Sequence, residues 1–553
     1  MANWIPSLFR IAALGLTMSV GAHAALAASP AWFGQALPPP VNDPAVPVVD
    51  TLNVDLPALL AKFGPGPTSP LLAGDKIKDD LKTIIGFSLK SKASGDFLWG
   101  RVSGTPAYYD TVTWAANAMK AGGVKDAHVE DFTASLTIPT AGELRIVGDA
   151  SYGEGTRDIV LQSMMVGGRG PVNGTVTAPM IYVGHATLAD MIGRDVKGKI
   201  AVLHTTLNPG MYSADEIGRP ALLVKAGAVG VIEILDQVGN MQAFDADRHG
   251  CGTGFCFTIG GADGFFLENM LGKAAGAGKV VSARMSSTAK EQTGLKTANA
   301  VGTIPGKTNR TIIINAHADA WFVGGDDNGG GLAVAVALAR YFAAQPQPDH
   351  TLVFLISAGH HTAGIGIPDF RLKHEKEYVT NADFIINLEH VANTGMVRSL
   401  TTTHDNNFGR PMVSTSTEWP KAVAVSNRAP FLIDVWRKGV SCFGLALQRV
   451  VDNNPPGEMG SFLNIQRMGS ILNPAAAESY KALPNITNVP ITQMISVGPL
   501  YHATGEGVDS VPAEGLERAA RFHAYMIQAA DKAAPDLLKG AAYTPSAGCP
   551  ATP

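Results

Sequence analysis

Continuous apolar runs alternate with helical patterns through the second half of the chain. Polar and apolar residues do not alternate in the runs at 311–316 (TIIINA), 351–357 (TLVFLIS) and 382–388 (ADFIINL), as they would in a strand with one face exposed to solvent. This indicates strands that are buried on both faces. Apolar residues at helical spacing follow at 331–344 and again at 515–534. Alternating buried strands and helices predict an α/β domain with a mainly parallel sheet and helices on both faces.

The first half of the chain has a different pattern of apolar and polar residues. Residues 106–120 place apolar side chains at helical spacing, and a turn at Gly122-Gly123 leads into alternating, strand-like sequence. From 158 to 292, short β runs such as APMIYVG and GKIAVLHTT are broken by glycine-rich turns. We expect a β-rich domain there, inserted into a catalytic domain made of 79–157 and 293–540, with a C-terminal tail at 541–553.

The N-terminus predicts export. A weakly basic start that ends at Arg10 precedes an apolar stretch, and small residues follow at 22–27. The stretch is shorter than the roughly 20 residues that a bilayer span needs, which favours a cleaved signal peptide over an anchor. We expect a signal peptide at 1–28, a proline-rich extended leader at 29–78, and a periplasmic or secreted protein.

The composition of the chain excludes some classes of binding partner but does not identify one. The chain has 553 residues, 46% of them hydrophobic, and a formal net charge of -4. Without long Lys/Arg runs, nothing predicts binding to nucleic acid or to an anionic membrane surface. Four cysteines are too few for a disulfide scaffold; Cys251 and Cys256 are the best candidates for a bridge, with buried free thiols as the alternative.

Ligand-type side chains follow the predicted strands at the points where they end. In open α/β sheets, ligands and catalysis gather at the carboxyl ends of strands. Imidazoles and carboxylates of this kind suit zinc, and paired zinc ions need a bridging carboxylate. The candidates are His317 and Asp319 after the first run, His360 and His361 after the second, Glu389 and His390 after the third, Asp326 and Asp327 in the loop GGDDNGGG, and Tyr501 and His502 in a late loop.

Simpler interpretations exist for each of these residues. Asp326 or Asp327 alone would more often cap the following helix, and a single histidine such as His317 would more often be structural. The glycine-rich loop carries no Gly-Lys-Ser/Thr for a phosphate, and no G-x-S-x-G elbow for a serine hydrolase occurs in the chain. Several such side chains at strand ends favour the metal site.

The stretch NAHADAWFVGGDDNGGGLAVAVALARYF (315–342) resembles the co-catalytic zinc aminopeptidases and carboxypeptidases, metallo-exopeptidase family 28, which includes glutamate carboxypeptidase II-like enzymes. The likeness continues in VSGTPAYYDTVTWAANAMKAGGV and in YHATGEGVDSVPAEGLERAARF. The segment DVKGKIAVLHTT with ALLVKAGAVGVIEILD looks like the protease-associated domain that this family often carries. The resemblance covers most of the mature chain.

The resemblance implies a role for each candidate. His317 would bind one zinc ion, Asp319 would orient it, and Asp327 would bridge two ions. Glu389 stands where the family usually has an aspartate ligand, and His502 would bind the second ion. Tyr501 resembles a tyrosine that steadies the tetrahedral intermediate in some members, although an ordinary packed tyrosine fits equally well.

His360 and His361 depart from the family, which normally has Glu-Glu at these positions. The first glutamate is the general base and the second is a zinc ligand. Neutral imidazole binds zinc well, so His361 can replace the ligand. His360 can replace the base, because a histidine beside a cation stays neutral and accepts a proton. The alternative is that the base is lost and a metal-binding relic remains.

These expectations define the function predicted from the sequence. We expect an exopeptidase that binds one or two Zn²⁺ ions and hydrolyses a peptide or small amide near a free terminus, with aminopeptidase as the default. A carboxypeptidase or an amidase on N-acyl amino acids is the alternative among enzymes, because the fold alone does not choose a substrate. A non-catalytic peptide-binding protein is the alternative from another class. Loops between about 395 and 500 would shape the cleft, with Glu458 reading a substrate amine or facing solvent.

Overall fold

The computed structural model describes most of the chain between residues 68 and 550, and these residues belong to one unit, 55–553. The predicted signal peptide and residues 29–67 of the predicted leader lie outside the described residues. The segments that are not described are 1–67, 149–156, 169–171, 206, 209–210, 213–217, 236–238, 245–250, 363, 401–410, 419–420, 452–456, 464–478, 480–481, 485, 487–488, 496–497, 499, 546–547 and 551–553.

A 14-stranded mixed sheet runs through the described part of this unit. Four parallel strands form its functional centre, in the order β14 (Thr351–Ser357), β12 (Thr311–His317), β15 (Ala382–Leu388) and β20 (Ile491–Ile495). Beyond β20 lie β18 (Lys421–Val425), antiparallel to it, and β19 (Leu447–Val451). The three apolar runs are β12, β14 and β15, and the predicted α/β fold is confirmed.

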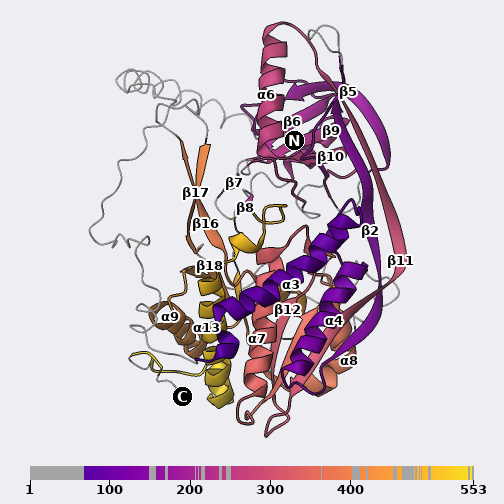
Figure 1. The fold of residues 1–553 in the computed structure, drawn as a ribbon. Helices are drawn as coiled ribbons and strands as arrows, with labels where there is room; N and C mark the ends of the chain where they lie inside the picture. Colours follow the sequence, from indigo (N-terminus) through magenta and orange to yellow (C-terminus); the bar gives the residue numbers. More distant parts are fainter. Residues whose placement is uncertain are drawn as a thin grey trace, which may run out of the picture. The chain divides into compact units, whose positions relative to one another are not determined.

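Helices cover both faces of the central strands. Successive side chains of each strand point into two different apolar clusters, one on each face. On one face, Ile312 and Ile314 pack with residues of α3 (Gly74–Ala93), α4 (Pro106–Ala121), α7 (Gly331–Ala343) and α13 (Ala513–Lys532) (Figure 1). On the other face, Ile313 packs with Ile367 of α8 (Gly366–His374) and Phe462 of α10 (Glu458–Leu463). Burial on both faces explains why these strands are apolar throughout.

A long strand joins the two halves of the sheet. β11 (Ser282–Ile304) is antiparallel to β14 at one end and to β5 (Gly174–Tyr182) at the other, and it pairs along most of its length with β2 (His128–Ile146) (Figure 1). The boundaries 158–292 for a separate inserted domain stay a prediction. This half also contains β3 (Ile159–Val160), β4 (Met165–Val166), β6 (Ile200–Thr205), α5 (Arg219–Lys225), β9 (Gly230–Leu235), β10 (Phe255–Ile259) and α6 (Gly261–Gly276).

The remaining described elements are short or lie at the margins. Three two-stranded sheets pair β1 (Gly100–Arg101) with β13 (Ala320–Trp321), β7 (Leu207–Asn208) with β8 (Met211–Tyr212), and β16 (Thr394–Leu400) with β17 (Pro411–Glu418). The others are η2 (Pro70–Leu72), η4 (Gly325–Gly330), η5 (His360–Thr362), η6 (Glu375–Val379), α9 (Pro430–Phe443), η7 (Val508–Ser510) and α14 (Pro535–Leu538).

The leader prediction is wrong at its C-terminal end. We expected extended chain up to residue 78, but η2 lies within that range and α3 begins at Gly74. The reason is packing: Leu72 and Ile77 are buried in the main apolar cluster, so this segment is already part of the fold. The helix predicted at 106–120 is α4, with Thr105 accepting a hydrogen bond from the Tyr108 N–H at its start.

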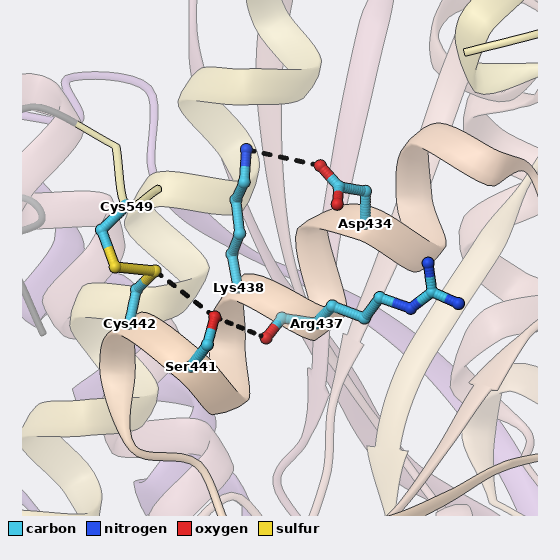
Figure 2. Close-up of a disulfide and its surroundings, with 6 residues drawn as sticks. All are labelled: Asp434, Arg437, Lys438, Ser441, Cys442 and Cys549. Carbon is cyan, nitrogen blue, oxygen red and sulfur yellow. Dashed lines mark hydrogen bonds and ion pairs between the residues drawn. A yellow bond between two sulfur atoms is a disulfide. The ribbon is translucent and has the colours of Figure 1, made fainter. Parts of the chain in front are cut away.

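Two disulfides are present. Cys251 and Cys256 are bonded to each other, as we expected for the likeliest pair. The second bond joins Cys442, in the last turn of α9, to Cys549 in the C-terminal tail (Figure 2). In the same helix, Lys438 forms an ion pair of 3.3 Å with Asp434, one turn earlier. Among the described residues, no helix combines the length and apolar character that crossing a bilayer requires.

Candidate metal centre

The carboxyl ends of the central strands bring the predicted histidines and carboxylates to one edge. His317 is the last residue of β12 and is paired with Ser357, the last residue of β14. His360 and His361 follow that strand in η5, and Glu389 and His390 follow β15 directly. Parallel pairing in register is therefore what gathers residues that are distant in the sequence.

The glycine-rich loop before α7 presents Asp327 to the same edge. Gly324 has a φ of +56°, and a Cβ there would lie 2.2 Å from the Cβ of Ala320. A Cβ on Gly331, at the start of α7, would lie 2.2 Å from the Asn328 Oδ1 atom. Both positions need glycine, because the loop folds tightly over β13 and against the helix start.

Asp326 and Asp327 do not cap this helix. Neither end of the loop has a side-chain capping bond. Asp326 instead accepts hydrogen bonds from His390 Nδ1 at 3.1 Å and from Asn393 Nδ2 at 2.9 Å. The simpler interpretation of the two aspartates as helix caps is therefore wrong.

Asp327 lies at the centre of the cluster. Its Oδ1 atom is 3.1 Å from His317 Nε2, and its Oδ2 atom is 2.8 Å from His502 Nε2 and 3.7 Å from His361 Nε2. Nitrogen and oxygen atoms of His317, Asp327 and His361 all lie within 4.8 Å of one another. One carboxylate thus faces three imidazoles from three different segments.

Glu389 extends the cluster on its other side. A Glu389 oxygen, Oε1, is 3.6 Å from His360 Nε2 and 3.9 Å from His390 Nε2. Ligand atoms of His317, His360 and Glu389 lie within 4.8 Å, as do those of Asp327, Glu389 and His390. All five residues predicted as metal ligands are therefore brought together.

The donor set fits a divalent cation. The Nε2 atom of His361 and the Oδ1 atom of Asp327 are buried and make no hydrogen bond within the described part of the chain. A buried polar atom left in this state is costly unless something else binds it. Imidazoles with carboxylates are the ligands that zinc prefers in proteins.

Electrostatics support the same conclusion. Burial would raise the pKa of Asp327, but charged imidazoles nearby and hydrogen bonds from His317 and His502 hold that pKa well below its usual value. Burial holds the pKa of His361 well below its usual value, so its ring is neutral near pH 7 and has a lone pair to donate. Burial would lower the pKa of His317, but hydrogen bonds to Asp319 and Asp327 hold that pKa well above its usual value, so metal binding there would release a proton.

Asp319 binds the backbone of the turn that carries His360 and His361. Its two carboxylate oxygens accept the backbone N–H groups of His360 at 3.0 Å and His361 at 2.9 Å. Its Oδ1 atom also lies 3.5 Å from His317 Nδ1. This geometry agrees with an orienting role, because one carboxylate fixes the His317 ring and the turn that carries the other two histidines.

Three acidic or basic groups near the cluster had been given no metal-binding or catalytic role from the sequence. Glu458 was expected to read a substrate amine or to face solvent; it is instead buried, 3.1 Å from His360 Nδ1. His390 adds a further imidazole. Glu506 accepts the Asp327 N–H at 3.0 Å, and burial together with Asp326 and Asp327 raises its pKa well above the usual value. Only His390, next to Glu389, carried a signal in the sequence.

Aromatic rings close the cluster from the side of the late loop. Trp321 stacks on His361 with ring centroids 4.6 Å apart and meets His502 edge-on at 4.8 Å. Phe244, from the β-rich half of the sheet, packs edge-on against Trp321, and its N–H donates to the His502 carbonyl. Tyr501 stacks on the His502 ring. Its comparison with an intermediate-stabilising tyrosine stays a prediction.

Solved structures share this fold. A peptidase M28 precursor from Shewanella amazonensis SB2B is 16% identical over 86% of this chain and 96% of its own, with a TM-score of 0.57. A zinc aminopeptidase from Bacillus subtilis is 17% identical over 84% of this chain and 97% of its own, with a TM-score of 0.52. At these identities the likeness establishes the fold. No curated protein matches the chain significantly.

Imidazoles and carboxylates gathered at the carboxyl edge of a parallel sheet are the arrangement expected of a divalent-metal site in an α/β protein. Residues 299–430, which hold every predicted site residue except Tyr501 and His502, match the model of peptidase family M28. This match over part of the chain supports a zinc-dependent peptidase.

Proposed function

We propose that the protein is an exported zinc aminopeptidase. The observation that carries the proposal is the convergence of three imidazoles, from His317, His361 and His502, on the single carboxylate of Asp327. His317, Asp327, His361, Glu389 and His502 would hold one or two zinc ions. When bound, zinc polarises a carbonyl and lowers the pKa of water. The B. subtilis zinc aminopeptidase has the same fold and supports the choice of substrate end.

His360 supplies the base in this proposal. Its Nε2 atom accepts a proton from water as the water oxygen bonds to the scissile carbonyl carbon. The same atom returns the proton to the amine nitrogen as the carbon–nitrogen bond breaks. Asp319 keeps His360 and His361 in place through their backbone N–H groups.

Export is supported by the two disulfides. Disulfides persist in oxidising compartments such as the periplasm and the extracellular space, and are rare in the cytosol. All four cysteines of the chain are paired. The N-terminal residues and the disulfides thus favour the same location.

Metal analysis and turnover of the Asp327→Asn variant test this function. We expect wild-type protein to hold one or two zinc ions per chain and to hydrolyse aminoacyl amides, but not peptides with a blocked amino terminus. The variant should lose metal and at least about a thousandfold in kcat/KM, because the neutral amide cannot bridge cations. The exposed Asp79→Asn variant is the matched control and should be unchanged.

The substrate panel separates the alternatives. Turnover of N-acyl amino acids or blocked peptides with a free carboxyl terminus would replace aminopeptidase by amidase or carboxypeptidase. Peptide binding with metal present and no turnover of any amide would contradict the enzyme proposal and leave a peptide-binding protein. Wild-type activity without metal, or in Asp327→Asn, would remove the metal mechanism.

A further inference from the structure

Glu458 is a buried carboxylate beside the Nδ1 atom of His360. Its Oε1 atom lies 3.1 Å from His360 Nδ1. The Glu458 side chain is fully buried, and the His360 side chain is 16% exposed. The two residues come from different segments, α10 and η5, so no sequence motif joins them.

Glu458 is itself held in place. Its second carboxylate oxygen accepts the Ser357 hydroxyl at 3.0 Å, at the end of β14. Its backbone N–H donates to Glu389 Oε2 at 3.2 Å. The preceding Gly457 has a φ of +86°, and a Cβ there would lie 2.3 Å from the same Glu389 oxygen. The chain passes so close to Glu389 that Glu458 has little freedom to turn away.

This geometry places the two ring nitrogens of His360 in different surroundings. A carboxylate beside Nδ1 favours a hydrogen on that atom, which leaves the lone pair on Nε2. The Nε2 atom faces Glu389 Oε1 at 3.6 Å, and the ring stacks on His317 at 4.2 Å between centroids. The basic nitrogen is therefore directed at the ligand cluster.

We propose that Glu458 is a positioning residue that fixes His360 in the tautomer and orientation required of a general base. The inference rests on the proposed function, in which His360 replaces a glutamate that the resembling family uses as its base. The chain then compensates for the substitution with a carboxylate from a distant segment. A role in reading a substrate amine does not fit, because both oxygens of Glu458 face protein donors.

A double-mutant cycle with Glu458→Gln and His360→Gln tests the inference. Glu458→Gln should lower kcat about 10- to 100-fold, the usual range for a partner that orients a site histidine, with KM and zinc content nearly unchanged. In the His360→Gln background the same change should have no further effect, because Glu458 acts only through that ring. Glu233→Gln is the control: Glu233 is also buried and accepts a hydroxyl hydrogen bond, from Thr205 at 2.6 Å.

The outcomes separate this inference from the proposed function. Equal losses from Glu458→Gln with and without His360 would mean a structural role and overturn the inference alone. Full activity of His360→Gln would overturn the proposed base and the inference together. Lost zinc in His360→Gln would make His360 a ligand and also overturn both.

A second measurement does not depend on turnover. In zinc-loaded protein labelled with ¹⁵N-histidine, the His360 ring, assigned by its loss in His360→Gln, should carry its proton on Nδ1, and Glu458→Ala should abolish this preference. A wild-type ring protonated on Nε2 would contradict the proposal even if no substrate is turned over.

Discussion

At the scale of single residues, Arg101 shows how the loop that carries the site is held through its backbone. The guanidinium group is buried and donates to the carbonyl oxygens of Ala318, Val323 and Gly324 and to the Ser88 hydroxyl. Burial lowers the pKa of Arg101 to about 10, with Asp319, Glu506 and Asp327 opposing the shift, so the group is charged near pH 7. One side chain thereby holds the backbone just before Asp319 and again at residues 323 and 324.

Replacing Arg101 by methionine should be strongly destabilising. The change removes four hydrogen bonds and leaves buried carbonyl acceptors unpaired, which we expect to cost about 3–5 kcal/mol of unfolding free energy. The matched control is Arg145→Met, which removes a partly exposed pair with Glu143 and should cost less than about 1 kcal/mol. Denaturant unfolding of both variants measures the difference. Similar losses in the two would contradict a special role for Arg101.

Some site residues could be predicted from the sequence and others could not, depending on the element that carries each one. His317, His361 and Glu389 were predictable because each follows an apolar run directly, and parallel strands bring such ends together. Glu458 was not, because it begins the short helix α10 and follows no apolar run that predicts a strand end. A hydrophobic pattern reports which face of an element is buried, and it carries no information on where a loop returns.

At the scale of elements, one disulfide could be predicted from the sequence and the other could not. Cys251 and Cys256 are 5 residues apart, so their pairing was open to inference from the sequence. Cys442 and Cys549 are 107 residues apart, and their contact requires α9 and the C-terminal tail to be placed first. Tyr543 also reaches back from the tail to Asp434 in α9, at 3.3 Å. The tail expected at 541–553 is therefore attached to the fold at α9.

The long-range disulfide should contribute more stability than the short one. Closing a loop of about 100 residues restricts the unfolded chain by roughly 4–5 kcal/mol in the chain-entropy account, and a very short loop restricts it by less. We expect Cys442→Ser with Cys549→Ser to lower the unfolding free energy by about 2–5 kcal/mol, and the corresponding Cys251, Cys256 variant to lower it less. The kcat and KM of the Cys442→Ser, Cys549→Ser variant at 25 °C should equal those of the wild type. The reverse order of stability would contradict the argument.

At the scale of the whole molecule, a second network of charged residues lies at the amino ends of the central strands, opposite the candidate metal centre. His350 precedes β14, so it lies at the other end of the strand from His360. Its ring nitrogens lie 3.2 Å from Asp531 of α13 and 3.2 Å from Asp383 of β15. Arg310 also pairs with Asp383, and Lys532 with Asp531. Hydrogen bonds to Asp531, opposed by burial, raise the pKa of His350.

This raised pKa predicts how stability changes with pH. A histidine whose pKa is higher in the folded state contributes stability that is complete below its unfolded pKa, near 6.5, and is lost as pH rises through the folded value. His350→Gln should therefore cost roughly 1–3 kcal/mol at pH 6, the range for hydrogen bonds to charged groups, and clearly less at pH 9. Thermal unfolding of zinc-loaded protein at both pH values measures the two differences. The exposed His128→Gln variant controls for a general effect of losing an imidazole. Because His350 joins α13 to the central strands, a cost that did not fall between pH 6 and pH 9 would mean that its packing, and not its charge, holds these elements together.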